Sequence, residues 1–490
     1  MTLFSPDLLN AIVPGGIITK SPWKGGSLMA KIYTDTELDF MKDMAGKLQN
    51  IEPIPEEVYS EYNVKRGLRN ANGTGVVVGL TKVGEVIGYT VNDKKEKMPC
   101  EGKLYYRGYD IEDLVGACVE EARFGFEEIT YLLLFGELPS KSELEDFKNL
   151  VGSNRELPKR FAADIMFTAP SPNLMNKLQR AILSLYSYDE APDDTSMENL
   201  VRQSIELIGF FPTLVAYAYQ VEQSYFHDKS LHLHYPVPEL STAENILRMI
   251  RPNGEYTYLE ARILDLCLIL HAEHGGGNNS TFTTHLVSSS GTDTYSAIAA
   301  AIGALKGPRH GGANTAVVNM IADLKRNVSD VSDFGQVEDY LVKVLKKEAN
   351  DMSGLVYGMG HAIYTISDPR AQLLKDMARK LAINTNRMED FMVCEYIENH
   401  TQALRAEITG NDKPMCANVD LYSGFVYDVL GIPTDLSTPL FANARLSGWC
   451  AHRLEEFTIG KKLMRPSYRS VEPIREYVPI KERGKEPEKN

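Results

Sequence analysis

The segment "EARILDLCLIL" at residues 260–270 is apolar on nearly every helical face. A helix of this kind is stable only when other helices surround it, so the segment predicts a helical bundle. It runs directly into "HAEHGGGNN", where His271, Glu273 and His274 precede three glycines. Glycine has no Cβ, so the backbone there can end the helix and approach a ligand closely. A buried helix that ends on imidazoles is therefore a candidate site.

Apolar residues at intervals of three and four continue through most of the chain from about residue 106 onward. This spacing is typical of helices, and acid-rich starts such as "SKSELEDF" at 140–147 mark their N-termini. The β-branched and glycine-rich run "GVVVGLTKVGEVIGYTV" at 75–91 predicts a short β-hairpin, and residues 37–66 predict a charged helical arm. The expected fold class is all-α, with a minor β-hairpin near the N-terminus.

Charge and cysteine spacing restrict the partners and the compartment. A formal net charge of -14 disfavours binding to nucleic acid or to an anionic membrane, because Lys and Arg hold both. The six cysteines form no CxxC pair, which is typical of reduced thiols in a cytoplasmic protein. The sequence has no long uninterrupted apolar run and no convincing export signal, and Met29 is an alternative candidate for the start.

Two further glycine-rich clusters carry a histidine. His310 lies in "LKGPRHGGANTAVV", between a Gly-Pro turn and a predicted helix start, and His361 lies in "YGMGHAIYTISDPRA", nine residues before Arg370. Neither cluster has the GxxxxGK[ST] pattern of a phosphate loop or a complete dinucleotide fingerprint. An imidazole beside a guanidinium suits a carbonyl flanked by carboxylates, since the first polarises the oxygen and the second binds an anion.

An acid and several arginines follow toward the C-terminus. Asp420 stands in the first turn of a helix predicted to begin near Asn418, where helix capping alone would explain an acid. Arg445 stands among small and apolar residues in "FANARLSGWCAHRLE", so we expect it to be buried and to require an anion. Arg465 and Arg469 follow in "LMRPSYRS".

A metal site at the end of the buried helix is a weaker interpretation. His271 and His274 are three residues apart, whereas a helical zinc-protease site has its histidines at i and i+4. The start "HAE" matches a zinc deaminase, but the PCxxC partner of that signature is missing. We therefore expect no metal, and without further information either histidine could be a hydrogen-bonded core residue.

Taken in order, the clusters resemble the motifs of the citrate synthase family. The matching patterns are HxxH followed by Gly and Asn, GPxHGxAN, GxGHxxYxxxDPR, NVDxYSG, and FAxARxxGWxAH followed by RP. The likeness extends upstream through "LYYRGYDIEDL" and "FEEITYLLLFGELP", and it covers about residues 65 to 470. It implies an all-helical, two-domain fold in a homodimer, with a small domain that closes over the substrates.

The resemblance also implies a division of the chain. Residues 1–64 would be an N-terminal extension and helical arm, and 65–312 a large helical domain. Residues 313–425 would be the small domain, and 426–490 the return to the large domain with a C-terminal arm. Closure of the small domain would keep a reactive thioester intermediate away from bulk water.

By resemblance, three residues carry the condensation of acetyl-CoA with oxaloacetate. Asp420 is the base that removes a methyl proton, His310 donates a hydrogen bond to the thioester oxygen, and His361 polarises the ketone carbonyl. The resemblance implies no metal and no redox cofactor, because acetyl-CoA is itself a substrate.

The resemblance assigns four ligands to oxaloacetate. His274 binds the substrate, and Arg370 and Arg445 hold its carboxylates as forked donors that Lys could not replace. Arg465 resembles the arginine that reaches the site from the partner subunit, so the site would be complete only in the homodimer.

Two positions depart from the family pattern, and a third has no assigned role. Glu273 stands where relatives often have Asp, which keeps the charge but alters its reach. Thr365 stands where relatives commonly have Lys or Arg, so a basic residue such as Lys375 or Arg379 becomes the candidate for CoA contacts. His271 has no role that we can argue beyond packing at the helix end.

The sequence leaves other functions to be weighed. A 2-methylcitrate synthase would use propionyl-CoA with the same acid and base groups, and one methylene in an apolar pocket is worth only about 1 to 3 kcal/mol. A noncatalytic relative that binds CoA or a dicarboxylate is disfavoured, because pure binding needs no positioned base. ATP-dependent citrate cleavage would need nucleotide and phosphohistidine domains for which 490 residues are too few.

Overall fold

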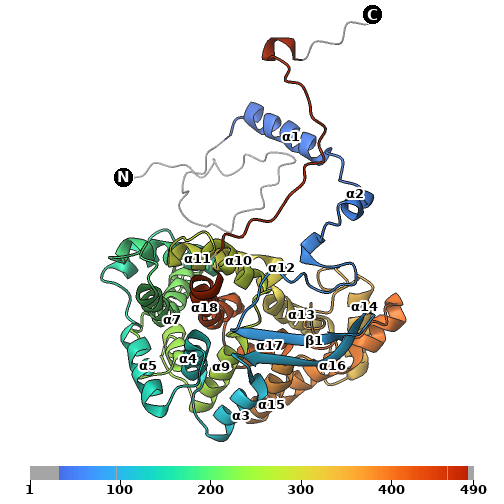
Figure 1. Ribbon diagram of the computed structural model, residues 1–490. Helices are drawn as coiled ribbons and strands as arrows, with labels where there is room; N and C mark the ends of the chain where they lie inside the picture. The colour runs from blue at the N-terminus through green and yellow to red at the C-terminus, as the bar shows by residue number, and fades with distance from the viewer. Residues whose placement is uncertain (1–32, 95, 461, 484–490) are drawn as a thin grey trace, which may run out of the picture.

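The structure is a computed structural model that describes residues 33–94, 96–460 and 462–483. Helices account for most of these residues, and the sheet is small (Figure 1). The predicted all-α fold class is confirmed. The α-helices are α1 Asp35–Gln49, α2 Glu56–Glu61, α3 Ile111–Glu120, α4 Phe126–Phe135, α5 Lys141–Ser153, α6 Leu174–Leu185, α7 Met197–His227, α8 Thr242–Ile250, α9 Tyr258–His271, α10 Asn279–Ser288, α11 Thr294–Lys306, α12 Pro308–Gly311, α13 Ala313–Asn327, α14 Phe334–Leu345, α15 Pro369–Asn384, α16 Met388–Thr409, α17 Val419–Val429 and α18 Ser437–Glu455. Short 3-10 or π segments are η2 Arg66–Leu68, η3 Ala162–Met166, η4 Tyr186–Tyr188, η5 Thr434–Leu436, η6 Glu456–Gly460 and η7 Ile480–Glu482.

Helix α9 is the buried helix predicted from its apolar sequence. Thr257 caps its first turn in a capping box with Glu260, and every residue from Ile263 to His271 is buried. The helix packs against α4, α8, α15 and α18, so neighbours cover it on several sides, as an all-round apolar helix requires. It ends at His271, where the sequence predicts its end.

A three-stranded antiparallel sheet follows the N-terminal arm. Strand β1 (Gly84–Val91) pairs with β2 (Lys97–Tyr106), and β2 pairs with the short β3 (Tyr109–Asp110). Figure 1 shows the two long strands lying across the helices at the front of the molecule. The sheet therefore covers part of the helical body rather than forming a domain of its own.

The predicted hairpin within 75–91 is correct in kind but wrong in extent. Only the second half of that run is a strand, and its partner lies outside the run, in β2. Val77 and Leu80 in the first half are 83% and 92% exposed, so they have no core to pack on, whereas β2 buries Leu104 and Tyr106. The strands form where their side chains are buried against the helices, and β-propensity alone does not predict burial.

The helices form two groups that meet at the centre of the molecule. Helices α4 to α11 pack with one another and with α18 on one side, and α13 to α17 pack on one another on the other side (Figure 1). Helix α15 contacts α3 and α9, and α13 contacts α18, so these helices join the groups. The second group coincides in sequence with most of the proposed small domain at 313–425, whose boundaries and closure stay predictions.

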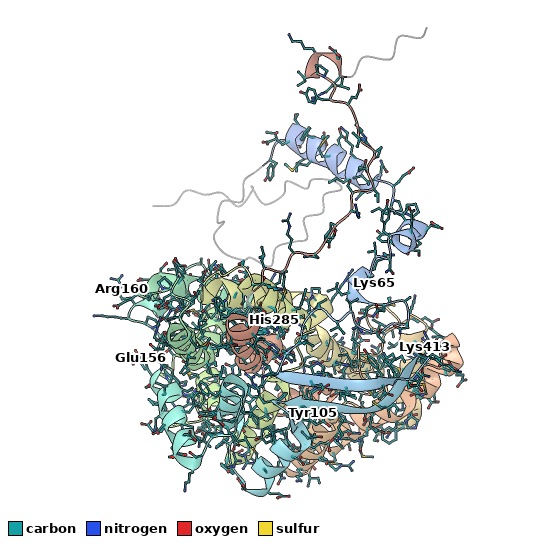
Figure 2. The ribbon with its side chains drawn as sticks, viewed as in Figure 1. Lys65, Tyr105, Glu156, Arg160, His285 and Lys413 are labelled. Atoms are coloured by element: carbon teal, nitrogen blue, oxygen red, sulfur yellow. The ribbon has the colours of Figure 1, made fainter. Side chains whose placement is uncertain are left out.

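Both ends of the described chain extend from the body. Helices α1 and α2 confirm a helical arm near residues 37–66, and neither contains a buried residue. The segment 462–483 also leaves the body with exposed apolar side chains, among them Tyr468 and Ile474 (Figures 1 and 2). Met29 lies outside the described residues.

Cysteine state and helix length bear on the environment of the chain. All six cysteines are free, and five of them are buried while Cys100 is half-buried. Within the described part of the chain, no helix combines the length and the apolar character needed to cross a membrane.

Candidate active site

Arg445 on α18 is a fully buried cation with unused donors. Its Nε donates to the His271 carbonyl at 2.7 Å, and the guanidinium lies over the Phe441 ring at 4.6 Å from its centroid. Neither Nη1 nor Nη2 has a hydrogen-bond partner among the described residues. Burial lowers the pKa of Arg445 to about 10, which leaves it protonated near neutral pH. A buried guanidinium with two free donors requires an anion, as the sequence predicts.

Arg370 lies in the first turn of α15 and is tied to Asp368. Its Nε and Nη2 donate to the two carboxylate oxygens of Asp368 at 3.0 and 2.7 Å, and Asp368 also caps α15 by accepting the Arg370 backbone N–H. Burial opposes the charge on Arg370, but Asp368 outweighs it and raises the arginine pKa. One edge of this guanidinium is therefore occupied, and the Nη1 edge remains for a ligand.

His361, His274 and Tyr364 form an aromatic cluster beside Arg370. The rings of His361 and His274 meet edge to face at 5.1 Å, and Tyr364 stacks on His361 at 4.7 Å. The Nδ1 of His361 accepts the backbone N–H groups of Ile363 and Tyr364, both at 3.1 Å. A nitrogen that accepts two hydrogen bonds carries no proton in neutral imidazole, so the proton of His361 lies on Nε2.

The charge states of these imidazoles follow from burial and from the arginines. Burial, with Arg370 adding to it, lowers the pKa of His361 to about 4. Burial followed by Arg370 and His361 lowers the pKa of His274 well below its usual value. Both rings are therefore neutral near pH 7, and His361 is a neutral hydrogen-bond donor through Nε2.

His310 in α12 has the opposite tautomer. Its Nε2 accepts the backbone N–H of Ser280 at 3.3 Å and lies 2.9 Å from the Ser280 hydroxyl, which in turn accepts the Trp449 indole N–H at 3.2 Å. The proton of the neutral ring therefore lies on Nδ1. Burial, with a smaller effect of Arg445, lowers the pKa of His310 to about 4, so the ring is neutral and donates through Nδ1.

Asp420 lies in the first turn of α17, but it does not cap that helix. Asn418 is the cap and accepts the Asp420 backbone N–H at 3.1 Å. The Asp420 carboxylate makes no hydrogen bond to any residue that the structure describes. Burial raises its pKa to about 6, although Arg370 and Arg445 pull the value down. An unpartnered carboxylate with a raised pKa is suited to accept a proton.

The loop that carries His361 is fastened to the turn that carries Asp420. The Asn418 backbone N–H donates to the Gly358 carbonyl at 2.9 Å, and its side-chain amide donates to the Gly360 carbonyl, also at 2.9 Å. Gly358 and Gly360 have φ values of 85° and 90°, a region that favours glycine. Residues about 60 positions apart in sequence are thereby held in one place.

The structure brings together all three predicted catalytic residues and three of the four predicted oxaloacetate ligands. Arg370 and Arg445 lie within electrostatic range of each other and of Asp420 and His274. His361 lies beside Arg370, and His310 lies within range of Arg445. The groups lie on α12, α15, α17 and α18, in the turn after α9 and in the loop before α15, and these elements border the junction of the two helix groups (Figure 1). The assembly can bind a dianion, donate two hydrogen bonds and accept one proton.

Three predicted residues lie outside this assembly. Arg465 is exposed on the C-terminal segment and makes no hydrogen bond or ion pair with the described residues. Lys375 pairs with Glu398 at 2.7 Å, and Arg379 pairs with Glu395, so neighbouring acids already neutralise both charges. A CoA contact by either residue stays a prediction.

Several residues that position the site residues were not predicted from the sequence motifs. The hydroxyl of Tyr106 bonds the Ile269 and Glu273 carbonyls, each at 3.0 Å, and so closes the end of α9. Asp368 stands in "DPR", a helix-start pattern that could have identified it as a cap and as a partner of Arg370. Ser280 is the partner of His310, but nothing in its local sequence signals that pairing. His271 stacks near Phe441 at 4.7 Å and has no hydrogen-bond partner for its ring among the described residues.

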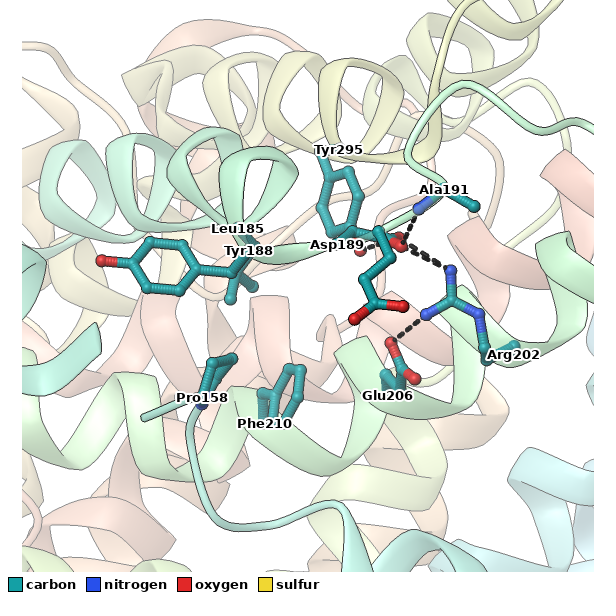
Figure 3. Close-up of a pocket in the computed structure, with 10 residues that line it drawn as sticks. Pro158, Leu185, Tyr188, Asp189, Ala191, Arg202, Glu206, Phe210 and Tyr295 are labelled. Atoms are coloured by element: carbon teal, nitrogen blue, oxygen red, sulfur yellow. Dashed lines mark hydrogen bonds and ion pairs between the residues drawn. The ribbon is translucent and has the colours of Figure 1, made fainter. Parts of the chain in front are cut away.

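A separate pocket of about 400 Å³ lies between α6, α7 and α11 (Figure 3). Its one arginine is already paired: Arg202 contacts Asp189 and Glu206 at 2.7 and 2.8 Å, and the Tyr295 hydroxyl donates to Asp189 at 2.6 Å. The remaining acid in its lining, Glu190, is exposed. Because this pocket has no unpaired buried cation, the assembly around Arg370 and Arg445 is the stronger candidate.

Comparison with known proteins gives a consistent family. Residues 71–467 match the family model of the citrate synthase C-terminal domain. Citrate synthase 2 of Bacillus subtilis is 36% identical over 384 residues, which cover 78% of this chain and 94% of that protein. The 2-methylcitrate synthase 1 of Corynebacterium glutamicum is 33% identical over 430 residues, which cover 86% of this chain and all of that protein.

Solved structures show the same likeness. The crystal structure of citrate synthase from Thermotoga maritima has a TM-score of 0.65 at 32% identity and covers 86% of this chain and 100% of its own. Citrate synthase from Thermoplasma acidophilum, in a ternary complex with carboxymethyl coenzyme A and oxaloacetate, has a TM-score of 0.69 at 26% identity. That match covers 86% of this chain and 99% of the other.

Proposed function

The chain belongs to the citrate synthase family of condensing enzymes, and from this we propose that it joins acetyl-CoA to oxaloacetate and, with water, releases citrate and CoA. One observation carries the proposal. A carboxylate with a raised pKa, Asp420, shares a site with two neutral imidazoles of fixed tautomer and with two buried guanidiniums. Such a set suits removal of a proton from a weak carbon acid in the presence of a dianion.

The first step is enolisation of the acyl group. The Asp420 carboxylate removes a proton from the methyl group of acetyl-CoA, and its raised pKa makes it a stronger base than an ordinary aspartate. The Nδ1–H of His310 donates to the thioester oxygen, where negative charge develops as the enol or enolate forms. Because His310 is neutral, the intermediate can be stabilised without a cation that would protonate it at once.

The second step forms the carbon–carbon bond. The enol carbon attacks the ketone carbon of oxaloacetate, while the Nε2–H of His361 donates to the ketone oxygen and then protonates it. The free donors of Arg445 and the Nη1 edge of Arg370 hold the two carboxylates, and His274 adds a contact. Fixing the dianion this way aligns the ketone with the enol.

The third step is hydrolysis of the citryl thioester by water, which releases CoA and makes the overall reaction irreversible in practice. Every proton in the sequence moves through Asp420, His310, His361 or water. We propose that this chemistry needs no redox or metal cofactor, since the acyl group arrives activated as a thioester.

We further propose that the active unit is a homodimer and that Arg465 of each chain completes the site of the other. The exposed position of Arg465 and its C-terminal segment, which leaves the body, support this arrangement (Figure 1). A mixture of Arg465→Ala and Asp420→Ala chains tests it, because a hybrid dimer keeps one intact site. Reassociated mixtures should regain about one quarter of the activity. Recovery of none would mean that the arginine acts in its own subunit.

The alternative function is 2-methylcitrate synthesis from propionyl-CoA and oxaloacetate. Two relatives named 2-methylcitrate synthase support this alternative, because they match this chain at 33% and 32% identity, close to the values for citrate synthases. A thiol-release assay with both acyl-CoAs at saturating oxaloacetate separates the two. We expect the larger kcat/KM with acetyl-CoA, and a clear preference for propionyl-CoA would replace the proposed substrate without changing the mechanism.

The compartment proposed for this reaction is the cytoplasm. Six free cysteines, five of them buried, fit a reducing environment, since nothing in the fold uses them as crosslinks. The acidic net charge of -14 fits small-molecule substrates rather than nucleic acid or a membrane surface.

A further inference from the structure

A cluster of two histidines and three carboxylates lies between α10 and α18, outside the groups that would touch substrate. Its members are His285 of α10, His452 and Glu455 of α18, Glu456, which follows α18 directly, and Glu273. All are buried except His285, whose side chain is 12% exposed. Figure 2 labels His285 beside α18.

A carboxylate orients each imidazole of the cluster. Glu273 Oε1 accepts the Nε2–H of His452 at 3.0 Å, and Glu456 Oε2 accepts the Nδ1–H of His285 at 2.9 Å. These acceptors place the single proton of each neutral ring on the nitrogen that faces the carboxylate. The remaining nitrogens, His452 Nδ1 and His285 Nε2, both present lone pairs, and they lie 2.9 Å apart.

Two facing lone pairs repel each other unless a positive charge lies between or beside them. An additional proton is one solution, and a metal ion is the other. The carboxylate of Glu455 distinguishes the two: its Oε2 is buried, has no hydrogen-bond partner in the described part of the chain, and lies 3.9 Å from His452 Nδ1. A proton shared by the two rings leaves this oxygen unpartnered, whereas a metal ion would bind it.

Charge favours the metal ion as well. Three carboxylates around two neutral imidazoles amount to three negative charges in a buried place. Arg107 and Arg445 both act electrostatically on Glu273, and Arg107 also acts on Glu455. Both guanidiniums donate to backbone carbonyls rather than to these acids. A divalent cation bound directly to Glu455 would offset the negative charge that these arginines do not pair with.

We propose that His285 Nε2, His452 Nδ1 and a Glu455 oxygen bind a divalent ion of the zinc type. Imidazole nitrogens and a carboxylate are ligands that suit zinc, and one atom from each of the three residues lies within 4.8 Å of the others. Ligands on tetrahedral zinc, with bonds of about 2.0 to 2.1 Å, are roughly 3.3 Å apart, so separations of 2.9 and 3.9 Å need only small side-chain movements.

Glu273 and Glu456 complete the arrangement, because metal-bound histidines usually donate their other N–H to a carboxylate. The ion would join α10 to α18, and through Glu273 it would support the turn that carries His274. Its role is therefore structural and lies apart from the proposed reaction. The inference departs from the sequence prediction of no metal, which considered only His271 and His274.

Metal analysis of the purified full-length chain tests the proposal. After incubation with Zn²⁺ and removal of free ion, we expect about one zinc per chain by mass spectrometry. Replacement by Co²⁺ should give the intense visible absorption of four-coordinate cobalt. Glu455→Gln and His285→Gln should lose the ion, while His400→Gln should keep it, because His400 is an exposed histidine on α16.

Glu456→Gln provides a variant that keeps all three ligands and changes only their support. We expect it to bind zinc about 10- to 100-fold more weakly than the unaltered chain. This variant answers the question even if removal of a ligand prevents folding. The proposal is overturned if the unaltered chain holds no more zinc or cobalt than His285→Gln, or if ¹⁵N NMR shows a proton shared by His285 and His452 in the presence of zinc. None of these measurements depends on enzymatic activity.

Discussion

The two sides of the candidate active site are built differently. On the anchoring side, formed by Arg445 and Arg370, both guanidiniums are buried and fixed by protein groups: Arg445 Nε donates to the His271 carbonyl, and Arg370 pairs with Asp368. On the reacting side, formed by His361 and Asp420, the side chains are half-buried, and the Asp420 carboxylate has no partner among the described residues. Rigid donors can hold a dianion, while groups that exchange protons must remain free to do so.

Two carboxylates, Glu273 and Asp420, show how the surroundings of a buried acid decide the direction of its pKa shift. Burial alone would raise the pKa of both Glu273 and Asp420. The pKa of Glu273 is nevertheless lowered, because His452, Arg445 and the Gly275 N–H stabilise its charge. The pKa of Asp420 is raised to about 6, because no hydrogen bond compensates its burial. Glu273 is thus a charge fixed by its neighbours, whereas Asp420 has the unpartnered carboxylate that the proposed mechanism requires of a proton acceptor.

The largest expected effect on activity comes from removing the negative charge of the proposed base, Asp420. Asp420→Asn keeps the shape of the side chain but cannot accept the methyl proton, so we expect kcat to fall by about 10² to 10⁴. Thiol release measured at saturating substrates reports the loss. Asp376→Asn, an exposed aspartate on α15, is the matched control and should retain full activity. A fall of only a fewfold for Asp420→Asn would assign the base to another group.

The anchoring side can be altered without touching the base. Arg445→Lys keeps the charge but loses the forked donors, and charged hydrogen bonds are worth about 1.5 to 3 kcal/mol each. We expect the KM for oxaloacetate to rise about 10- to 100-fold, with a smaller change in kcat. Steady-state kinetics with varied oxaloacetate measures both values. A loss confined to kcat would mean that Arg445 acts on the reacting atoms rather than on binding.

The pH profile distinguishes the proposed base from the two imidazole donors, because their pKa values differ. Asp420 must be deprotonated to act, so kcat/KM should fall on the acid side of pH about 6, by about tenfold per pH unit. His310 and His361, with pKa values of about 4, stay neutral donors and should add no further step above pH 5. The profile of kcat/KM for acetyl-CoA between pH 5 and 8 measures this. A flat profile down to pH 5 would contradict the raised pKa of Asp420.

The smallest expected effect is on stability, and its sign is opposite to that on activity. A carboxylate whose pKa is raised by folding stabilises the folded state when protonated, and this contribution is lost as the pH rises through about 6. Asp420→Asn should therefore raise the melting temperature at pH 7.5 and leave it unchanged near pH 4. Partial exposure of the group limits the gain to about 1 kcal/mol. Destabilisation at pH 7.5 would show that the charge is compensated in the folded protein.

Local patterns predicted the parts of the fold that depend on local sequence. The apolar run of α9 predicted both its burial and its end at His271, and the small neighbours of Arg445 predicted a buried guanidinium. The sequence could not decide whether Asp420 only caps its helix. The structure shows that Asn418 is the N-cap of α17. The motifs place His274 just after α9 and Asp420 in the first turn of α17, whereas His361 lies in the loop before α15 and Arg445 lies in the middle of α18.

Pairings between distant segments could not be predicted. The partner of β1 lies in a run that carries little β-propensity, and burial of Leu104 rather than its local sequence selects it. His285 and His452 are 167 residues apart and belong to no shared motif, so their contact follows only from the packing of α10 on α18. The sequence indicates which side chains each helix carries, but the packing of the helices determines which of those side chains come into contact.

Hydrogen exchange at the acyl methyl group tests the central claim most directly, because it isolates the step assigned to Asp420. Acetyl-CoA is incubated in D₂O with the enzyme and malate, a dicarboxylate without the ketone, and deuterium in the methyl group is followed by NMR. We predict exchange with the unaltered chain and with His361→Gln, and none above background with Asp420→Asn. Exchange by Asp420→Asn at the unaltered rate would contradict the account.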